Sequence, residues 1–220
     1  MTALPRSTLL SAFARSFLIQ GSWNYRTMQG SGFAFALLPA LRRIFRGRPA
    51  ELQASVQRHL EHFNAHPYLS SMAVGAVLRL EADGEDAEDV RRFKMAVRGP
   101  LGGLGDSLVW ASWLPAVSMA ALSLYWLGVP GWLAALVFVV VYNVGHVGLR
   151  VWGFRAGLAE GRGVGRSLVR ASLAEWTERV RTAASLLLGI LAGAILWGEG
   201  GLVDAGPTWS ALAVGAFAGG

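Results

Sequence analysis

The chain has 220 residues, and its 15% charged and 53% hydrophobic content departs from the roughly one-quarter charged share of an ordinary soluble domain. Nine tryptophans and 28 glycines indicate a membrane protein, because membrane interfaces favour tryptophan and contacts between spanning helices favour glycine. The net charge of +6 does not indicate a nucleic acid partner, since the cations flank apolar runs, and the lack of cysteine excludes disulfides and thiolate metal ligands.

The N-terminal half, residues 1–95, holds apolar stretches that are too short to cross a bilayer. Segments 9–20 and 51–63 each repeat apolar residues on one helical face, which predicts two amphipathic helices, the first of them at the membrane surface. Residues 33–41 and a helix expected over 67–80 are interpreted as re-entrant or broken elements. Such elements are tolerated at membrane depth only inside protein or beside a water-filled cavity.

A polar and aromatic stretch at 19–43 supports two interpretations. Gln20, Asn24 and Gln29 offer amide groups that can bind a sugar. The aromatic and basic side chains between them are equally typical of anchors at a membrane interface. The sequence leaves both interpretations open.

The segment HLEHFNAHPYLSS (59–71) is rich in groups that form hydrogen bonds or bind metals. Three histidines share one helical face if the helix continues, namely His59, His62 and His66. Pro67 disfavours a helix at the residue before it, so we expect no metal site and interpret the histidines as helix-end groups or as part of a polar cluster. In the second case Glu61, Asn64 and His66 present donors and acceptors to a neutral, hydroxyl-rich ligand.

Residues 81–94 are expected to form a charged, solvated connection, and the glycine-rich stretch GPLGGLGD (99–106) follows. A phosphate-binding loop needs a lysine after its last glycine, where this chain has Asp106, so phosphate binding is not expected. Two interpretations of this stretch remain, a plain turn and the tip of a re-entrant hairpin. An acid beside a charge-free apolar interval is costly, which favours a gating hairpin with Asp106 at its tip. Its backbone is formed by Gly99, Pro100, Gly103 and Gly105.

The middle of the chain, residues 99–149, carries no lysine or arginine. It contains two apolar segments, 108–127 and 131–149, and each is close to the ~20 residues that a helix needs to cross a bilayer. A tight turn joins them. A third, shorter span is expected at 183–197, whereas the apolar run at 208–218 is too short to span.

Clusters of lysine and arginine flank the expected spans and predict their orientation, because such clusters stay in the cytoplasm. One cluster precedes the first span at 91–98, and another extends from the second span to the third at 150–181. The turn at 128–131 and the residues after 181 carry no cation. The spans therefore alternate in direction, which predicts a multi-pass protein of the bacterial inner membrane.

Four stretches resemble, in this order, the IID component of the mannose/fructose/sorbose family of the bacterial phosphotransferase system (PTS). They are SFLIQGSWNYRTMQGSGFAFALLPALRR, RHLEHFNAHPYLSSMAVGA, FKMAVRGPLGGLGDSLVW and YNVGHVGLRVWGFRAGLAEG, within residues 7–197. Together with the patterns above, the resemblance predicts an all-α polytopic integral membrane protein with about three to four transmembrane helices, re-entrant hairpins and interfacial amphipathic helices. We expect a single domain over 1–220, divided into an amphipathic and re-entrant half (1–95) and a hairpin with transmembrane helices (96–220).

The resemblance implies a role in sugar uptake. A IID subunit pairs with a IIC membrane subunit to bind and translocate a hexose of the mannose, fructose or sorbose class. Soluble IIA and IIB components phosphorylate the sugar as it enters, and IIC–IID pairs form trimers that work by an elevator-like movement. The IID subunit itself carries no phosphorylated residue, so neither catalytic activity nor a cofactor is expected.

The family's HPY and GPL-G-GD motifs fall on residues 66–68 and 99–106. The resemblance therefore implies a sugar-facing set, which comprises Glu61, Asn64, His66 and Asp106. Two departures from the family are visible: His62 stands where an aromatic residue is common, and the segment after Trp197 is shorter than the expected insertion and further span. The second departure leaves an alternative, an abbreviated IID-like regulatory or scaffolding protein of an incomplete PTS. A membrane enzyme that uses the histidine cluster is a further rival.

Overall fold

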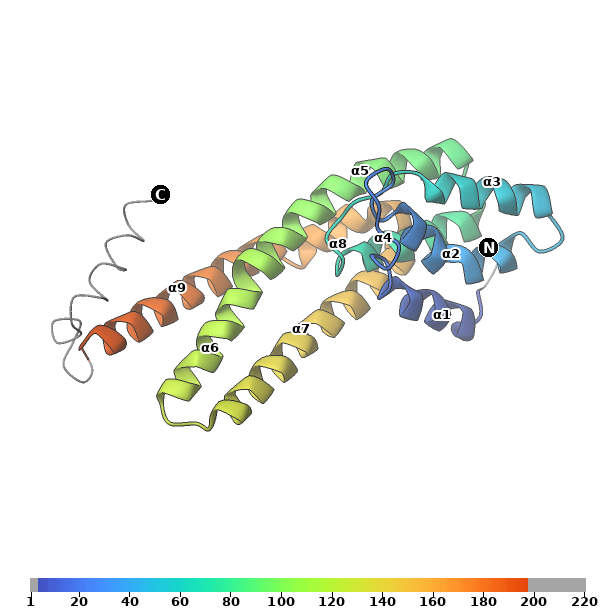
Figure 1. The fold of residues 1–220 in the computed structure, drawn as a ribbon. Coiled ribbons are helices and arrows are strands. Elements are labelled where there is room, and N and C mark those ends of the chain that lie inside the picture. Colours follow the sequence, from blue (N-terminus) through green and yellow to red (C-terminus); the bar gives the residue numbers. More distant parts are fainter. Residues whose placement is uncertain (1–3, 198–220) are drawn as a thin grey trace.

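A computed structural model describes residues 4–197, and Figure 1 shows a block of helices from which longer helices extend. The helices, in chain order, are α1 (Arg6–Ser16), α2 (Gly30–Ile44), α3 (Pro49–Leu60), α4 (Ser70–Asp83), α5 (Ala87–Gly105), the π-helix η1 (Asp106–Trp113), α6 (Leu114–Trp126), α7 (Gly131–Glu160), the 3-10 helix η2 (Gly161–Gly163), α8 (Val164–Arg170) and α9 (Leu173–Trp197). The all-α prediction is confirmed. The apolar run at 208–218 lies outside the described residues.

Helices α1 to α4 pack into one block, and α4 lies at its centre. Because α4 is apolar on nearly every side, it is stable only when protein surrounds it, and it contacts α1, α2, α5 and α7. The helices predicted at 9–20 and 51–63 are present as α1 and α3, but α1 ends at Ser16 and α3 at Leu60, earlier than predicted. Residues 33–41 lie within α2, so the expected broken element is instead a complete helix with a buried apolar face. This helix packs against α1, α3 and α4.

Helices α4 and α7 approach each other closely because glycines line their contact. A Cβ at Gly157 would overlap the backbone of Met72, and a Cβ at Gly75 would overlap the carbonyl oxygen of Phe154. Gly153 and Gly157 are spaced four residues apart, the small-residue spacing that lets membrane helices pack backbone to backbone. This contact carries α7 past residue 149, where the sequence predicted that its span would end, to Glu160.

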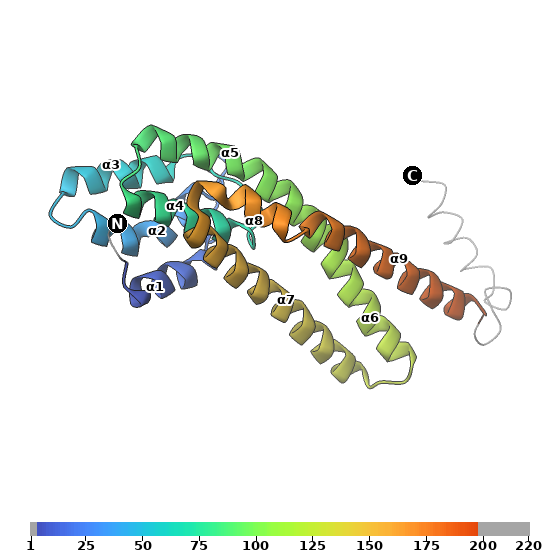
Figure 2. The ribbon, with the colours of Figure 1, turned by 180° about the vertical axis from the view of Figure 1, so that it is seen from behind.

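The long helices form a hairpin, which Figures 1 and 2 show from opposite sides. Helix α6 ends at Trp126 and α7 begins at Gly131, so the predicted tight turn is confirmed. By length and composition, two helical stretches are apolar enough to cross a membrane, Ala87–Trp126 and Gly131–Ala194. Little of either is buried, which leaves their side chains for lipid or a partner. The third expected span, 183–197, forms the second half of α9.

The predicted charged connection and the predicted hairpin tip are both wrong, because most of these residues are helical. Helix α4 extends to Asp83, and α5 begins at Ala87 after Asp86 caps it by accepting a hydrogen bond from the backbone N–H of Glu88. Helix α5 then continues through the whole glycine-rich stretch 99–106 into the π-helix. Pro100 lies inside this helix, where it removes one backbone hydrogen bond without ending the helix.

Candidate functional site

An extended segment, residues 61–69, interrupts the helices between α3 and α4, and Gln29 holds it in place. The Gln29 amide is buried, donating from Nε2 to the carbonyl oxygen of Ala65 at 2.7 Å and accepting from the Ala65 N–H at 3.3 Å. The Gln29 N–H also donates to the carbonyl oxygen of Phe63 at 2.8 Å. The Gln29 side chain thus pairs with backbone N–H and C=O groups that have no helical hydrogen-bond partner.

A cavity of about 390 Å³ lies where this segment meets α5 and the π-helix. Its polar lining comes from four separate parts of the chain: Gln20, Gln29, Asn64, His66, Arg98 and Asp106. Trp110 provides an aromatic wall, and glycines of α5 provide a side without protruding side chains. A small cavity with a few convergent polar groups is the usual form of a site for a small polar ligand.

His66 is the buried polar group of this cavity whose hydrogen bonding is incomplete. Its ring is buried, and Nδ1 accepts a hydrogen bond from the Tyr68 N–H at 3.3 Å, so the neutral ring carries its proton on Nε2. Among residues 4–197, Nε2 has no hydrogen-bond partner. Burial lowers the pKa of His66 to about 4, with a smaller contribution from the Arg150 charge. The ring is therefore a neutral donor that lacks an acceptor.

Asn64 and Asp106 both line this cavity, and both are exposed. Neither side chain forms a hydrogen bond with another described residue, whereas nearby Arg98 donates to His62 Nδ1 at 2.8 Å. An amide and a carboxylate that are free in this way can donate to and accept from the hydroxyl groups of a ligand.

The glycines of the supposed hairpin separate into two kinds. Gly99 and Gly103 line the cavity, and a Cβ at either position would meet no atom within 4 Å. A Cβ at Gly105 would instead overlap the His66 side chain, and neither Gly105 nor Pro100 is part of the cavity lining. Thus Gly99 and Gly103 keep the space open, and Gly105 allows His66 to approach the helix.

Glu61 is not brought to the cavity, contrary to the sequence prediction. Its carboxylate is paired with Arg91 of α5, and the hydrogen bond from Arg91 holds the pKa of Glu61 below its usual value of 4.5. An ion pair of this kind fixes α5 against the start of the extended segment. It leaves the carboxylate unavailable to a ligand in the cavity.

The other histidines do not form a metal site. Helix α3 ends at Leu60, so His59 and His66 do not continue on one helical face. Within residues 4–197, no three histidine, aspartate or glutamate side chains are grouped closely enough to hold a metal ion.

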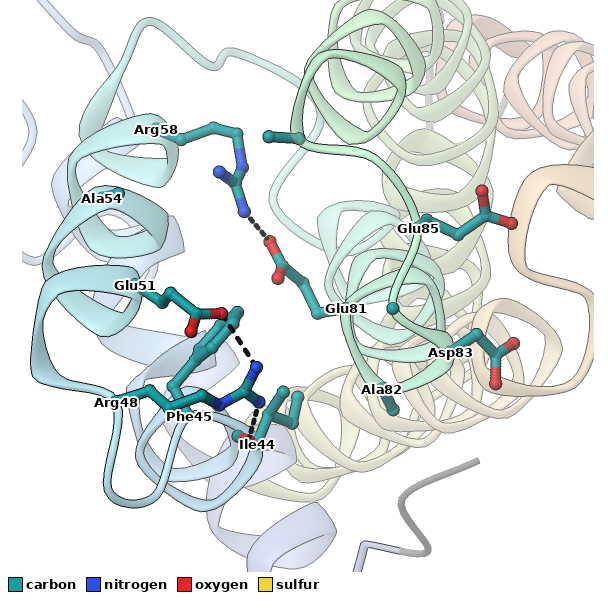
Figure 3. A pocket seen from close by; sticks show the side chains of 12 residues that line it. Ile44, Phe45, Arg48, Glu51, Ala54, Arg58, Glu81, Ala82, Asp83 and Glu85 are labelled. Atoms are coloured by element: carbon teal, nitrogen blue, oxygen red, sulfur yellow. Dashed lines mark hydrogen bonds and ion pairs between the residues drawn. The ribbon is translucent and has the colours of Figure 1, made fainter.

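His59 belongs to a second polar cluster, centred on Glu81 of α4. Glu81 and its partner Arg58 line a separate pocket of about 510 Å³, which Figure 3 shows. Glu81 Oε1 accepts hydrogen bonds from Arg58 at 2.6 Å and His59 Nε2 at 2.8 Å. Burial alone would raise the pKa of Glu81, but these two partners outweigh burial and hold the pKa below 4.5. Burial lowers the pKa of His59. This buried contact joins α3 to α4, and the Glu81 charge is paired within it, so we interpret it as a structural contact.

Sequence reasoning missed two members of the cavity, Arg98 and Trp110. Arg98 lies in α5, four residues before Gly102, and Trp110 lies in the π-helix, four residues after Asp106. These one-turn spacings become visible only once the glycine-rich stretch is known to be helical. Sequence reasoning also missed the stacking of Tyr68 on His146 of α7, whose ring centroids are 3.9 Å apart. The HPY motif indicated that Tyr68 is important, but nothing in the sequence indicated that it stacks on His146.

Comparison with known proteins assigns the family. Residues 3–197 match the PTS system mannose/fructose/sorbose family IID component. The chain belongs to this family. This IID component is 30% identical over 193 residues to the mannose-specific EIID component of Escherichia coli strain K12, covering 86% of this chain and 68% of that protein. It is 26% identical over 194 residues to the fructose permease IID component of Bacillus subtilis strain 168, with 86% and 69% covered.

Solved structures agree with this assignment. The IID component is similar to a chain in the cryo-EM structure of the mannose transporter ManYZ and microcin E492 complex, with a TM-score of 0.68 and 28% identity over 90% of this chain and 73% of that chain. A second structure, described only as a membrane protein, has a TM-score of 0.74 and 30% identity over 86% and 70%. This IID component is therefore a membrane subunit of a PTS transporter.

Proposed function

We propose that this IID component pairs with a IIC membrane subunit and that the pair binds a hexose and carries it across the bacterial inner membrane. Soluble IIA and IIB components phosphorylate the sugar, and the IID chain supplies binding groups without catalysing the transfer. The working assembly is a trimer of IIC–IID pairs, with the chain crossing the membrane several times. The similarity to a chain of the mannose transporter ManYZ complex supports the pairing.

The observation that carries the sugar-binding proposal is the cavity that brings Asn64, His66 and Asp106 together. These residues come from the extended segment and from the π-helix, which are far apart in the sequence. An amide, a neutral imidazole N–H and a carboxylate offer both donors and acceptors, the mixture that hydroxyl groups require. Gly99 and Gly103 leave the space that a ring-shaped ligand would fill.

The position of the cavity also supports a transport role. Transporters commonly bind substrate where helices are interrupted, because the interruption leaves backbone and polar groups free to contact the substrate. Such groups are tolerated there only when protein or a water-filled cavity shields them from lipid. Here the extended segment 61–69 and the π-helix border the same cavity. The π-helix itself is a rare element that is frequent at functional sites.

The test is hexose binding by the purified IIC–IID pair, measured with a panel of labelled hexoses. Asp106→Asn and His66→Gln each remove one polar interaction, so we expect affinity to fall roughly ten- to hundredfold. Asp83→Asn is the matched control, because Asp83 pairs with Arg79 on the surface of α4 and does not line the cavity. Unchanged affinity in both cavity variants, or an equal loss in the control, would refute the site.

A further inference from the structure

A groove between α1 and α7 is separate from the cavity described above. Figures 1 and 2 show α1 lying beside the C-terminal part of α7. The two helices are held together at one end, where the Phe13 and Phe154 ring centroids are 5.3 Å apart and Arg150 donates to the Ser16 carbonyl oxygen at 2.9 Å. Toward the start of α1 a groove of about 350 Å³ lies between them.

The groove is lined by apolar side chains and ends in two arginines. Its apolar lining comes equally from the two helices: Leu9, Leu10, Phe13, Val151, Phe154 and Leu158. Arg6 of α1 and Arg155 of α7 complete the lining. An apolar slot with cations at its rim matches a molecule that has a hydrocarbon chain and an anionic headgroup.

The two arginines are available to such a headgroup. Both are exposed, and neither forms an ion pair or a side-chain hydrogen bond within the part of the chain that the structure describes. Other arginines near this end of α7 are already paired with acids: Arg162 with Glu85 and Asp89, and Arg166 and Arg170 with Glu160. The positive charge of Arg6 and Arg155 is thus left without a partner from residues 4–197.

The surface around the groove favours lipid over water. Leu10 is 66% exposed, and Phe17, the residue that follows α1, is 38% exposed. Side chains of this size on an amphipathic helix belong in the hydrocarbon boundary of a membrane. Arg6 and Arg155, exposed at the same groove, can then attract lipid phosphates.

We propose that the groove between α1 and α7 binds an anionic phospholipid, with one acyl chain along the apolar lining and its phosphate between Arg6 and Arg155. This site anchors α1 to the membrane next to the contact between Arg150 and Ser16. The lipid would add to the Phe13–Phe154 contact that already joins α1 to α7.

The test uses the full chain purified with its IIC partner and stripped of lipid in a neutral detergent. Native mass spectrometry then measures binding of phosphatidylglycerol and of phosphatidylcholine with the same acyl chains. We expect phosphatidylglycerol to bind more tightly. The double variant Arg6→Gln/Arg155→Gln should lose roughly 25-fold in affinity for it, about fivefold for each arginine. The matched control Arg42→Gln/Arg46→Gln removes two other exposed arginines without a partner among residues 4–197 and should bind lipid as the parent does.

A second variant tests the apolar part of the site. Leu10→Trp enlarges an exposed side chain that lines the groove, so it should weaken both lipids without unfolding α1. Excess inorganic phosphate should not displace phosphatidylglycerol, because the acyl chain contributes most of the contact area. Equal binding of the two lipids, equal losses in both double variants, or no lipid bound while the IIC partner fills the groove would each overturn the proposal.

Discussion

Gly105 lies directly against the His66 ring, so closely that a Cβ at position 105 would overlap the imidazole. The absence of a side chain in α5 therefore sets how near the extended segment can come to this helix. It also fixes where the unpartnered Nε2 of His66 lies relative to the cavity wall.

Replacement of Gly105 by alanine should lower both stability and hexose binding. In an unobstructed helix the same change stabilises by about 1 kcal/mol, but here the added methyl group overpacks against His66 at a cost of about 1–3 kcal/mol. Gly103→Ala is the control, since a Cβ there meets nothing within 4 Å. Thermal unfolding in detergent should show a lower Tm for Gly105→Ala and an equal or higher Tm for Gly103→Ala. The reverse order would contradict this account of the contact.

The hydroxyl groups of Tyr68 and Tyr142 are 2.8 Å apart and join the extended segment to α7. Tyr68→Phe and Tyr142→Phe should each cost about 1 kcal/mol, and the double variant should cost little more than either single change. Chemical unfolding of the four proteins in the double-mutant cycle measures this coupling. Tyr25→Phe, at a tyrosine that is 86% exposed, should have no effect. Additive losses would mean that the two hydroxyl groups act independently.

Stability should fall as the pH drops below about 6.5. Burial lowers the pKa of His66 from 6.5 to about 4, so the unfolded chain takes up a proton in this range that the folded chain does not. Because the pKa of His66 is lower in the folded chain than in the unfolded chain, the contribution of neutral His66 to the free energy of unfolding is fully present above pH 6.5. It is lost as the pH falls toward 4. His59 is shifted in the same direction by burial and adds to the loss.

The variant His66→Gln isolates the contribution of His66, because glutamine does not titrate. Its Tm should decline less steeply than that of the parent between pH 6.5 and pH 4, while above pH 7 the two curves should run parallel. The remaining decline in the variant reports His59 and, below pH 4.5, Glu81. Identical slopes in the two proteins would show that His66 is not kept neutral by its site.

The contact between α4 and α7 should be intolerant of any side chain at Gly157. An alanine there would overlap the Met72 carbonyl oxygen, so the helices would have to separate at a cost of about 3 kcal/mol. Gly148→Ala, on the same helix with nothing within 4 Å, is the control. Size-exclusion chromatography after detergent extraction should recover folded protein for Gly148→Ala and much less for Gly157→Ala. Equal recovery of the two variants would show that α4 and α7 can separate to accommodate the added methyl group at little cost.

The charge pattern predicted the long helices well, because lysine and arginine are costly inside a bilayer. It located the turn between α6 and α7 to within a few residues. It placed the end of the second span at residue 149, too early for α7, because the cluster of cations begins at Arg150. Arg150 is instead 3% exposed, bonded to His146 and to the Ser16 carbonyl oxygen, and such tertiary partners leave no trace in local sequence.

The glycine-rich stretch misled for a related reason. Glycine and proline disfavour a helix by intrinsic propensity, which predicts a turn at residues 99–106. The helix forms because neighbouring structure encloses it: Leu101 is fully buried in the core and Gly105 packs on His66. Of the four predicted sugar-facing residues, three line one cavity. The fourth, Glu61, is instead paired with Arg91, which is distant in the sequence and could not be predicted as its partner.

The eight-residue π-helix between α5 and α6 has a consequence for how the two helices are phased. Its bonds reach one residue further than those of an α-helix, as in the bond from the Leu114 N–H to the Val109 carbonyl oxygen. The face of α5 that lines the cavity is therefore not continued by the same face of α6. Loss of one residue between 107 and 112 would rotate one helix against the other by about 100°. The number of residues in the π-helix therefore sets the direction in which the cavity-lining face of α5 points relative to α6.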